Sequence, residues 1–202
     1  MTYSIIGRDP ETGEIGCAVQ SKFPGVGSIV LHGRVFAGGE GAACLTTQAF
    51  SNPRHGDDGL TLMERGATPA EALAILTGDD DVCDERQIAA MTLTTPPAAF
   101  TGETAVSWEG AVGSCTGAHC VTTGNALASD CVLSDMVTAF GAVEGELTER
   151  LVAALRAGWD AGGELRGQQS AAVLVMKAGG GYDGSGVAHV DISVYDHAEP
   201  IE

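Results

Sequence analysis

The first twenty residues carry two short apolar runs separated by a turn. Residues 2–8 and 14–21 have the length and the β-branched content of strands, and the turn between them contains Pro10 and Gly13. Proline presets the backbone for a reversal and glycine completes it, so this pattern predicts a β-hairpin over residues 2–21. Further apolar runs predict strands at 28–31 and 42–48.

The spacing of apolar residues becomes helical between residues 60 and 76. Within this segment Thr68 is a suitable N-cap, Pro69 suits the first helical position, and Glu71 completes a capping box. Because Gly66 interrupts the pattern, we expect a pair of helices rather than one.

The second half of the chain repeats this order of strands and helices. A second helix pair is expected at 126–141 and 146–161, broken at Gly145, with Asn125 as a candidate N-cap of the first helix. Six further strands are expected, at 87–93, 98–100, 105–112, 119–122, 169–177 and 187–195. Strands that alternate with helix pairs in this way indicate a layered α+β fold, and 202 residues suit a single domain over residues 1–202.

The net negative charge of the chain argues against two classes of binding partner. The chain has 27 acidic and 10 basic residues and a net charge of −17, which repels nucleic acids and anionic membrane surfaces. No apolar run approaches the roughly 20 residues of a membrane helix, and polar residues interrupt any secretory leader. We therefore expect a cytoplasmic protein that binds neither nucleic acid nor membrane and keeps its six cysteines reduced.

Thr2 is the first candidate catalytic residue. If Met1 is removed, the Thr2 hydroxyl lies beside a free α-amine, whose pKa is ordinarily about 7.7–8.0. Such an amine can act as the base that activates the hydroxyl as a nucleophile. The strand that begins at Thr2 would hold this chain end in place. If Met1 is retained, the mechanism fails, because an amide nitrogen is no base.

Polar residues interrupt the apolar pattern at several predicted strand ends. They could orient the amine, bind substrate or stabilise an oxyanion. Asn52 also has a purely structural interpretation as a turn residue, and Asn125 as the N-cap mentioned above. The candidate residues are Gln20, Ser21, Gln48, Asn52, Asn125 and Ser170. Cysteine and histidine spacing fits no standard metal site and no phosphate-binding loop occurs, so we expect no metal or organic cofactor.

Several segments resemble, in order, those of domain-of-unknown-function family 1028. They are MTYSIIGRDPETGEIGCAVQS, TTQAFSNPRHGDDGL, VTTGNALAS, GGELRGQQSAAVLV and VYDHAEPIE. That family is grouped by fold with the N-terminal nucleophile (Ntn) hydrolases. The resemblance implies a four-layer αββα sandwich, with two antiparallel sheets between two helix pairs. It also implies that Thr2 is the nucleophile.

The chain departs from this resemblance at the second strand. Threonine-nucleophile relatives in the wider superfamily place an Asp near the position of Gln20 and Ser21, and the Asp acts with a Lys. Lys22 and Arg34 are the two candidate cations for that role in this chain. The departure favours a simpler mechanism in which the α-amine alone is the base.

Three functional hypotheses follow. The leading one is hydrolysis of a C–N (amide) bond in a small metabolite by Thr2, in a protein that base rates predict to be a homodimer. The alternative is a non-catalytic small-molecule binding or assembly protein that keeps the fold. A third is a thiol enzyme that uses Cys17 or Cys44, although neither has a histidine or a cation beside it in the sequence.

Overall fold

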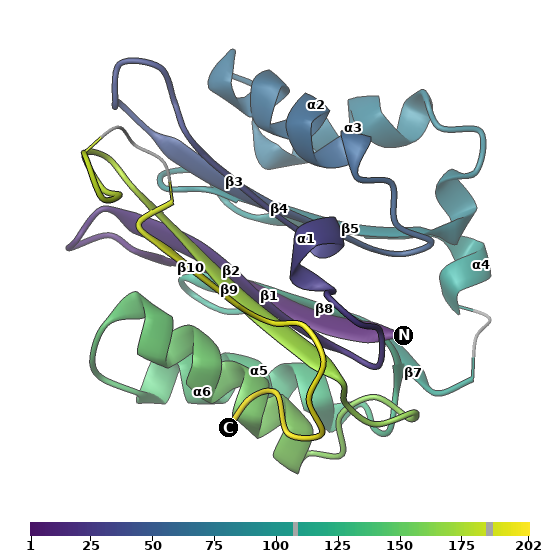
Figure 1. Cartoon of the computed structure of the whole chain (residues 1–202). Helices are drawn as coiled ribbons and strands as arrows, with labels where there is room; N and C mark the ends of the chain where they lie inside the picture. The colour runs from purple at the N-terminus through teal and green to yellow at the C-terminus, as the bar shows by residue number, and fades with distance from the viewer. Residues whose placement is uncertain (107–108, 185–187) are drawn as a thin grey trace.

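A computed structural model describes residues 1–106, 109–184 and 188–202. Within these residues the chain forms ten strands and six α-helices (Figure 1). The strands are β1 (Thr2–Asp9), β2 (Glu14–Ser21), β3 (Leu31–Val35), β4 (Ala42–Ala49), β5 (Arg86–Thr92), β6 (Ala98–Thr101), β7 (Ala111–Thr116), β8 (Cys120–Leu127), β9 (Ser170–Lys177) and β10 (Val190–Val194). The helices are α1 (Gly27–Val30), α2 (Arg54–Glu64), α3 (Pro69–Gly78), α4 (Glu103–Val106), α5 (Cys131–Ala142) and α6 (Leu147–Asp160), with a 3-10 turn, η1 (Cys83–Glu85).

The strands form two antiparallel sheets. One has six strands in the order β10-β9-β2-β1-β8-β7, and the other has four in the order β3-β4-β5-β6. Strand β1 lies inside the larger sheet, between its hairpin partner β2 and β8. The first strand is therefore held on both sides, which is unusual for a chain terminus, where the backbone commonly frays.

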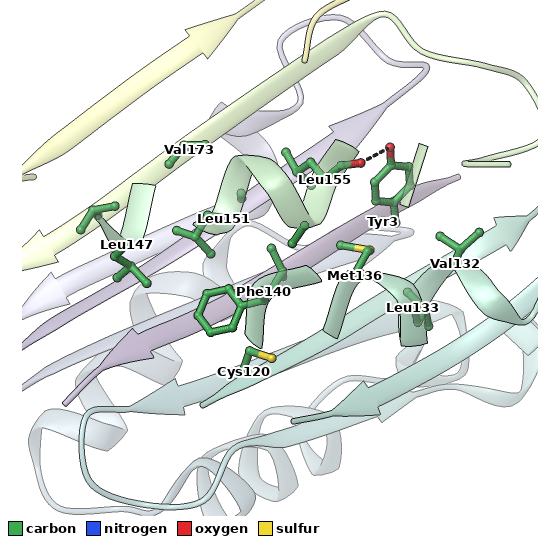
Figure 2. Close-up of a cluster of buried hydrophobic side chains, with 14 of the residues drawn as sticks. Tyr3, Cys120, Val132, Leu133, Met136, Phe140, Leu147, Leu151, Leu155 and Val173 are labelled. Carbon is green, nitrogen blue, oxygen red and sulfur yellow. Dashed lines mark hydrogen bonds between the residues drawn. The ribbon is translucent and has the colours of Figure 1, made fainter. Parts of the chain in front are cut away.

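The two sheets lie face to face, and helices cover their outer faces (Figure 1). Helices α5 and α6 pack on the six-stranded sheet, where Tyr3, Phe140 and Leu151 belong to one buried cluster (Figure 2). Helices α2 and α3 pack on the four-stranded sheet. A third cluster, which includes Ile6 and Cys44, fills the space between the sheets. These layers confirm the predicted α+β architecture with two antiparallel sheets.

Strand alternation decides which way Thr2 points. Successive side chains of a strand point to opposite faces of the sheet. Tyr3 and Ile5 belong to the cluster under α5 and α6, whereas Ile6 belongs to the cluster between the sheets. Thr2 and Ser4 share the face of Ile6, so Thr2 faces the four-stranded sheet.

Most of the local predictions are confirmed. The hairpin over residues 2–21 forms, with Thr2 opposite Ser21. Both helix pairs form, and the predicted capping box at the start of α3 is complete, with Thr68 accepting from the Glu71 backbone N–H and Glu71 accepting from that of Thr68.

Two predictions near the site are wrong. Residues 28–31 were expected to be a strand, but 27–30 form the single turn α1, which contacts both sheets at one end of the space between them. Val30 of α1 and Val26, just before it, are buried there, so burial and not local strand preference decides this segment. Asn125 is not a helix N-cap, because β8 continues to Leu127 and α5 begins only at Cys131. Pairing of β8 with β1 outweighs the local capping signal.

Two other predicted strands fall partly outside the described residues. The strand predicted at 105–112 covers positions 107–108, and the described part splits into α4 and β7. The last predicted strand began at position 187, and the described strand begins at Val190.

Candidate active site

Four of the predicted site residues form one row across the end of the six-stranded sheet. Ser21 lies opposite Ser170 on β9 and opposite Thr2 on β1, and Thr2 lies opposite Asn125 on β8. Residues directly opposite each other in antiparallel strands point to the same face. The pairing therefore collects side chains that are more than a hundred residues apart in the chain.

Thr2 is nearly buried, with 6% of its surface exposed. Its Oγ1 donates to Ser21 Oγ at 3.1 Å, and Ser21 Oγ in turn donates to the carbonyl oxygen of Met1 at 2.8 Å. Arg166 Nη2 donates to the same carbonyl oxygen at 2.9 Å. Two donors thus converge on the peptide group that precedes the candidate nucleophile.

A cavity of about 230 Å³ opens beside Thr2 at this end of the two sheets. Strand β4 of the smaller sheet contributes to it through its last residues. The polar part of the lining is Thr2, Ser21, Gln48, Ser51 and Arg166, and the rest is Met1, Phe23, Val26, Ile29, Val30 and Ala49. At roughly 30 Å³ per water molecule, the volume suits a small metabolite rather than a polymer.

Charge around the chain end is arranged by Glu164 and Arg166. Both Nε and Nη2 of Arg166 donate to Glu164 Oε2, at 3.2 and 3.0 Å. Glu164 also accepts from the backbone N–H of Lys22 at 3.1 Å, and burial raises the pKa of its carboxyl. Burial and, to a smaller extent, the Arg166 charge lower the pKa of the Met1 amine to about 6, although Glu164 opposes this shift. The Met1 amine is therefore mostly neutral at pH 7.

A buried network of amides backs the cavity. Gln48 Nε2 donates to Gln87 Oε1 at 2.6 Å, and Asn125 Nδ2 donates to the same oxygen at 2.9 Å. Ser4 Oγ donates to Gln48 Oε1 at 2.7 Å. All four residues are at most 1% exposed, so the bonds join the two sheets in the absence of solvent. Such a fully buried network holds Gln48 in one orientation at the cavity.

Comparison with known proteins places the chain in a family. Residues 2–202 match the family model described as "Family of unknown function (DUF1028)". The chain belongs to the DUF1028 family. It is also similar to a solved structure described as the crystal structure of protein SPO2555 from Silicibacter pomeroyi, a DUF1028 protein. The TM-score is 0.85 at 34% sequence identity, over 99% of this chain and 84% of that one. The search of curated proteins gave no match.

Not every candidate residue of this DUF1028 chain reaches the cavity. Gln20 lies opposite Tyr3 and points to the helix side of the sheet, where its Nε2 donates to the Gly167 carbonyl oxygen at 3.4 Å. Asn52 lines a different cavity, of about 420 Å³, beside α2 and α3. Ser170 is buried, accepts from the backbone N–H of Val26 at 3.1 Å and donates to the carbonyl oxygen of Phe23. It anchors the segment that leads into α1.

Neither of the two candidate cations reaches Thr2. Lys22 Nζ donates to the carbonyl oxygen of Gln168, and Arg34 pairs with Glu64 at 3.3 Å and with Asp57 at 3.6 Å. Arg166 is the cation that lines the cavity. Its place beside the chain end depends on the connection between α6 and β9, which no local pattern reports.

Sequence reasoning left three residues out of the candidate set, namely Glu164, Arg166 and Gln87. The sequence does point to Gln87, because this residue is a polar position in a predicted apolar strand, as Gln48 is. The sequence places Arg166 in a polar segment that opens the strand expected at 169–177, whereas Glu164 lies in a glycine-rich segment that is typical of a surface loop. Only the fold shows that the Glu164 side chain is buried and close enough to the Met1 amine to alter its pKa.

The thiol hypothesis finds no support in the geometry. All six cysteines, which lie within the described residues, are free thiols. Cys17 and Cys44 are both fully buried between the sheets, and burial raises the pKa of Cys44 well above its usual range. A thiol nucleophile needs access and a thiolate. Burial denies access at both positions, and the raised pKa of Cys44 also disfavours its thiolate.

The described residues hold neither a metal-binding cluster nor a membrane-spanning helix. In residues 1–106, 109–184 and 188–202, no three His, Cys, Asp or Glu side chains lie together as a metal ion would require. No helix in those same ranges is long and apolar enough to cross a membrane.

Proposed function

We propose that this protein is an N-terminal-threonine hydrolase of an amide bond in a small metabolite, active once Met1 has been removed. The observation that carries the proposal is the position of the Thr2 hydroxyl, which lines a cavity beside two hydrogen-bond donors, Ser21 and Arg166. The two face-to-face sheets between helix pairs are compatible with the Ntn-hydrolase fold that the resemblance implies.

The mechanism uses the α-amine that Met1 removal exposes. The amine accepts the Oγ proton as Thr2 Oγ attacks the carbonyl carbon of the substrate amide. The C–N bond then breaks, and the proton passes to the leaving nitrogen, which departs as an amine. Water next attacks the acyl ester on Thr2, with the same α-amine as base, and releases a carboxylic acid and the free hydroxyl.

Removal of Met1 also supplies the donors for this reaction. Ser21 Oγ and Arg166 Nη2 both donate to the Met1 carbonyl oxygen and lose that acceptor when Met1 leaves. Freed donors at a nearly buried site can bind the carbonyl oxygen of a substrate and stabilise the negative charge that develops on it. Donors of this kind contribute about 10²–10³-fold to the rate in other hydrolases.

The test compares processed protein with Thr2 variants. Protein that lacks Met1, verified by intact mass, is assayed for ammonia or amine release from small amides. Thr2→Ala should lose at least about a thousandfold in kcat, whereas Thr2→Ser should keep measurable activity because it keeps the hydroxyl. Thr12→Ala, in the exposed turn of the same hairpin, is the matched control. Full activity of Thr2→Ala would rule the mechanism out.

A second candidate function is small-molecule binding, or assembly, without catalysis. The hydrogen bonds to the Met1 carbonyl oxygen favour this second function, because Ser21 and Arg166 already have an acceptor there when Met1 is present. Intact-mass measurement on protein from its native host separates the two. Loss of one methionine residue supports the hydrolase, and a mass that includes Met1 supports the binding protein.

A further inference from the structure

The cavity beside Thr2 has two chemically different sides. Its polar side is described above and contains Gln48 and Arg166. Its apolar side comes from α1 and the segment before it, where Val26 and Val30 are each 3% exposed and Ile29 is half-buried. A ligand that fills this space must therefore present a polar end and an apolar end.

The apolar side is rigidly supported. Val26 and Val30 pack with Val19 of β2 and Ala172 of β9 in one buried cluster. Ser170 ties this segment to β9 through the backbone N–H of Val26. The side chains that face the cavity here are aliphatic and branched, so a charged ligand group placed against them would lose its hydration without gaining a partner.

The polar side presents a defined donor. Gln87 Nε2 donates to the carbonyl oxygens of Gly124 and Gly113 at 2.9 and 3.2 Å. Carbonyl oxygens only accept, so Gln87 must turn its own oxygen toward Gln48. Gln48 then accepts from Ser4 and keeps one N–H of its amide free of the network. Because Gln48 lines the cavity, this remaining N–H is the group with which it can bind an acceptor of the ligand, such as a carbonyl oxygen.

We propose that the substrate is the amide of a short, uncharged, branched aliphatic acid. The acyl carbonyl lies beside Thr2, its oxygen meets the donors of the polar side, and the alkyl chain packs against Val26, Ile29 and Val30. This inference rests on the proposed hydrolysis. In that reaction the new ester joins Thr2 Oγ to the aliphatic acyl group, the amine leaves with the proton, and water releases the aliphatic acid.

The experiment uses three primary amides as probes: isovaleramide, acetamide and succinamate. Ammonia release by Met1-free protein should show a kcat/KM for isovaleramide about tenfold or more above that for acetamide, since a few buried methyl groups in an apolar pocket discriminate by this amount. Succinamate, whose chain ends in a carboxylate, should not be hydrolysed measurably.

Variants then test whether the apolar side of the cavity determines the substrate preference. Ile29→Asp should remove the preference for isovaleramide, whereas Ile75→Asp is the matched control, because Ile75 is an exposed isoleucine on α3 outside this cavity. Thermal melting of both variants confirms that they fold. An Ile29→Asp protein that is folded and keeps the preference overturns the inference.

Binding separates failure of this inference from failure of the proposed function. Isovaleramide and succinamate are titrated by NMR into the Thr2→Ala protein without Met1. If isovaleramide binds beside α1 and wild type hydrolyses none of the probes, the assigned ligand class stands and the hydrolase proposal fails. If wild type hydrolyses succinamate as fast as isovaleramide, or if succinamate binds as well, the aliphatic class is wrong and the hydrolase proposal is unaffected.

Discussion

At the scale of residues, the site depends on a few buried polar atoms with defined partners. Arg166 acts to lower the pKa of both the Met1 amine and Glu164, and Glu164 acts to raise that of the amine. Gln87 has a comparable role for amides, because its oxygen and its nitrogen each serve partners that no solvent can replace. Substitution in the Glu164–Arg166 pair or at Gln87 therefore changes the site through the groups that these residues contact.

The first residue-scale prediction concerns the Met1 amine. In protein that retains Met1, an NMR titration should find its pKa at about 6, because burial disfavours the charged amine and Arg166 repels it. Arg166→Gln removes the repelling charge, so the pKa should rise. Arg156→Gln is the control, since Arg156 is exposed and pairs with Glu202. An unchanged pKa in Arg166→Gln would contradict the assignment of Arg166 as the nearby cation.

The second residue-scale prediction concerns Gln87. Gln87→Leu removes the acceptor of the Gln48 and Asn125 amide hydrogens and the donor to Thr101 and to two backbone carbonyls. Because each buried unpaired group costs about 1–3 kcal/mol, unfolding free energy in urea should fall by about 3 kcal/mol or more. Gln169→Leu should change it by less than about 0.5 kcal/mol, since Gln169 bonds Asp196 at the surface, where water can substitute. Equal effects of the two variants would refute the network argument.

At the scale of elements, a buried ion group ties the α2–α3 pair to the smaller sheet. Asp80, just beyond α3, accepts from Arg86 Nε of β5 at 2.8 Å and lies 3.2 Å from His55 Nε2 of α2. The Arg86 hydrogen bond lowers the pKa of Asp80, whereas burial lowers the pKa of His55 despite the attraction of Asp80. His32, on β3, has its pKa lowered by burial as well.

This group predicts a pH dependence of stability. A histidine with a lowered pKa in the folded state takes up its proton more readily when unfolded, so unfolding free energy should decrease as pH falls below about 6.5. His55→Gln should flatten part of this decrease, and the rest belongs to His32 and, in protein that retains Met1, to the Met1 amine, whose lowered pKa adds a decrease between about pH 8 and 6. The exposed His197→Gln variant should leave the profile unchanged. Urea unfolding between pH 5 and 8 measures it, and a wild-type profile that stays flat there would be contrary to the prediction.

At the scale of the whole molecule, the excess of negative charge is the dominant feature. A net charge of −17 on 202 residues implies self-repulsion, which salt screens over about 10 Å at 0.1 M. Raising NaCl from 20 to 500 mM should therefore increase the melting temperature by about 2–4 °C, the shift that roughly 1 kcal/mol produces in a protein of this size. Choline chloride should act equally if screening is the cause. A melting temperature that decreases with salt would show that ion pairs outweigh repulsion.

Much of the architecture follows from local pattern. The first hairpin, both helix pairs and the capping box at Thr68 depend on residues close in sequence, so turn chemistry and periodicity were enough to predict them. The misassigned segments were those where a distant partner decides. Asn125 carries a capping signal, but it lies in β8. There it pairs with Thr2 of β1, and its side chain donates a hydrogen bond to Gln87 of β5.

The sequence alone determined that this chain is a layered α+β domain and that Thr2 begins a strand with polar residues near its partner's end. Only the tertiary structure decided which polar residues meet there. It brought Ser21, Gln48 and Arg166 to Thr2 and directed Gln20 to the opposite face of the sheet. The physical reason is that strand register and sheet stacking set these neighbours, and both arise from burial of residues far apart in the chain.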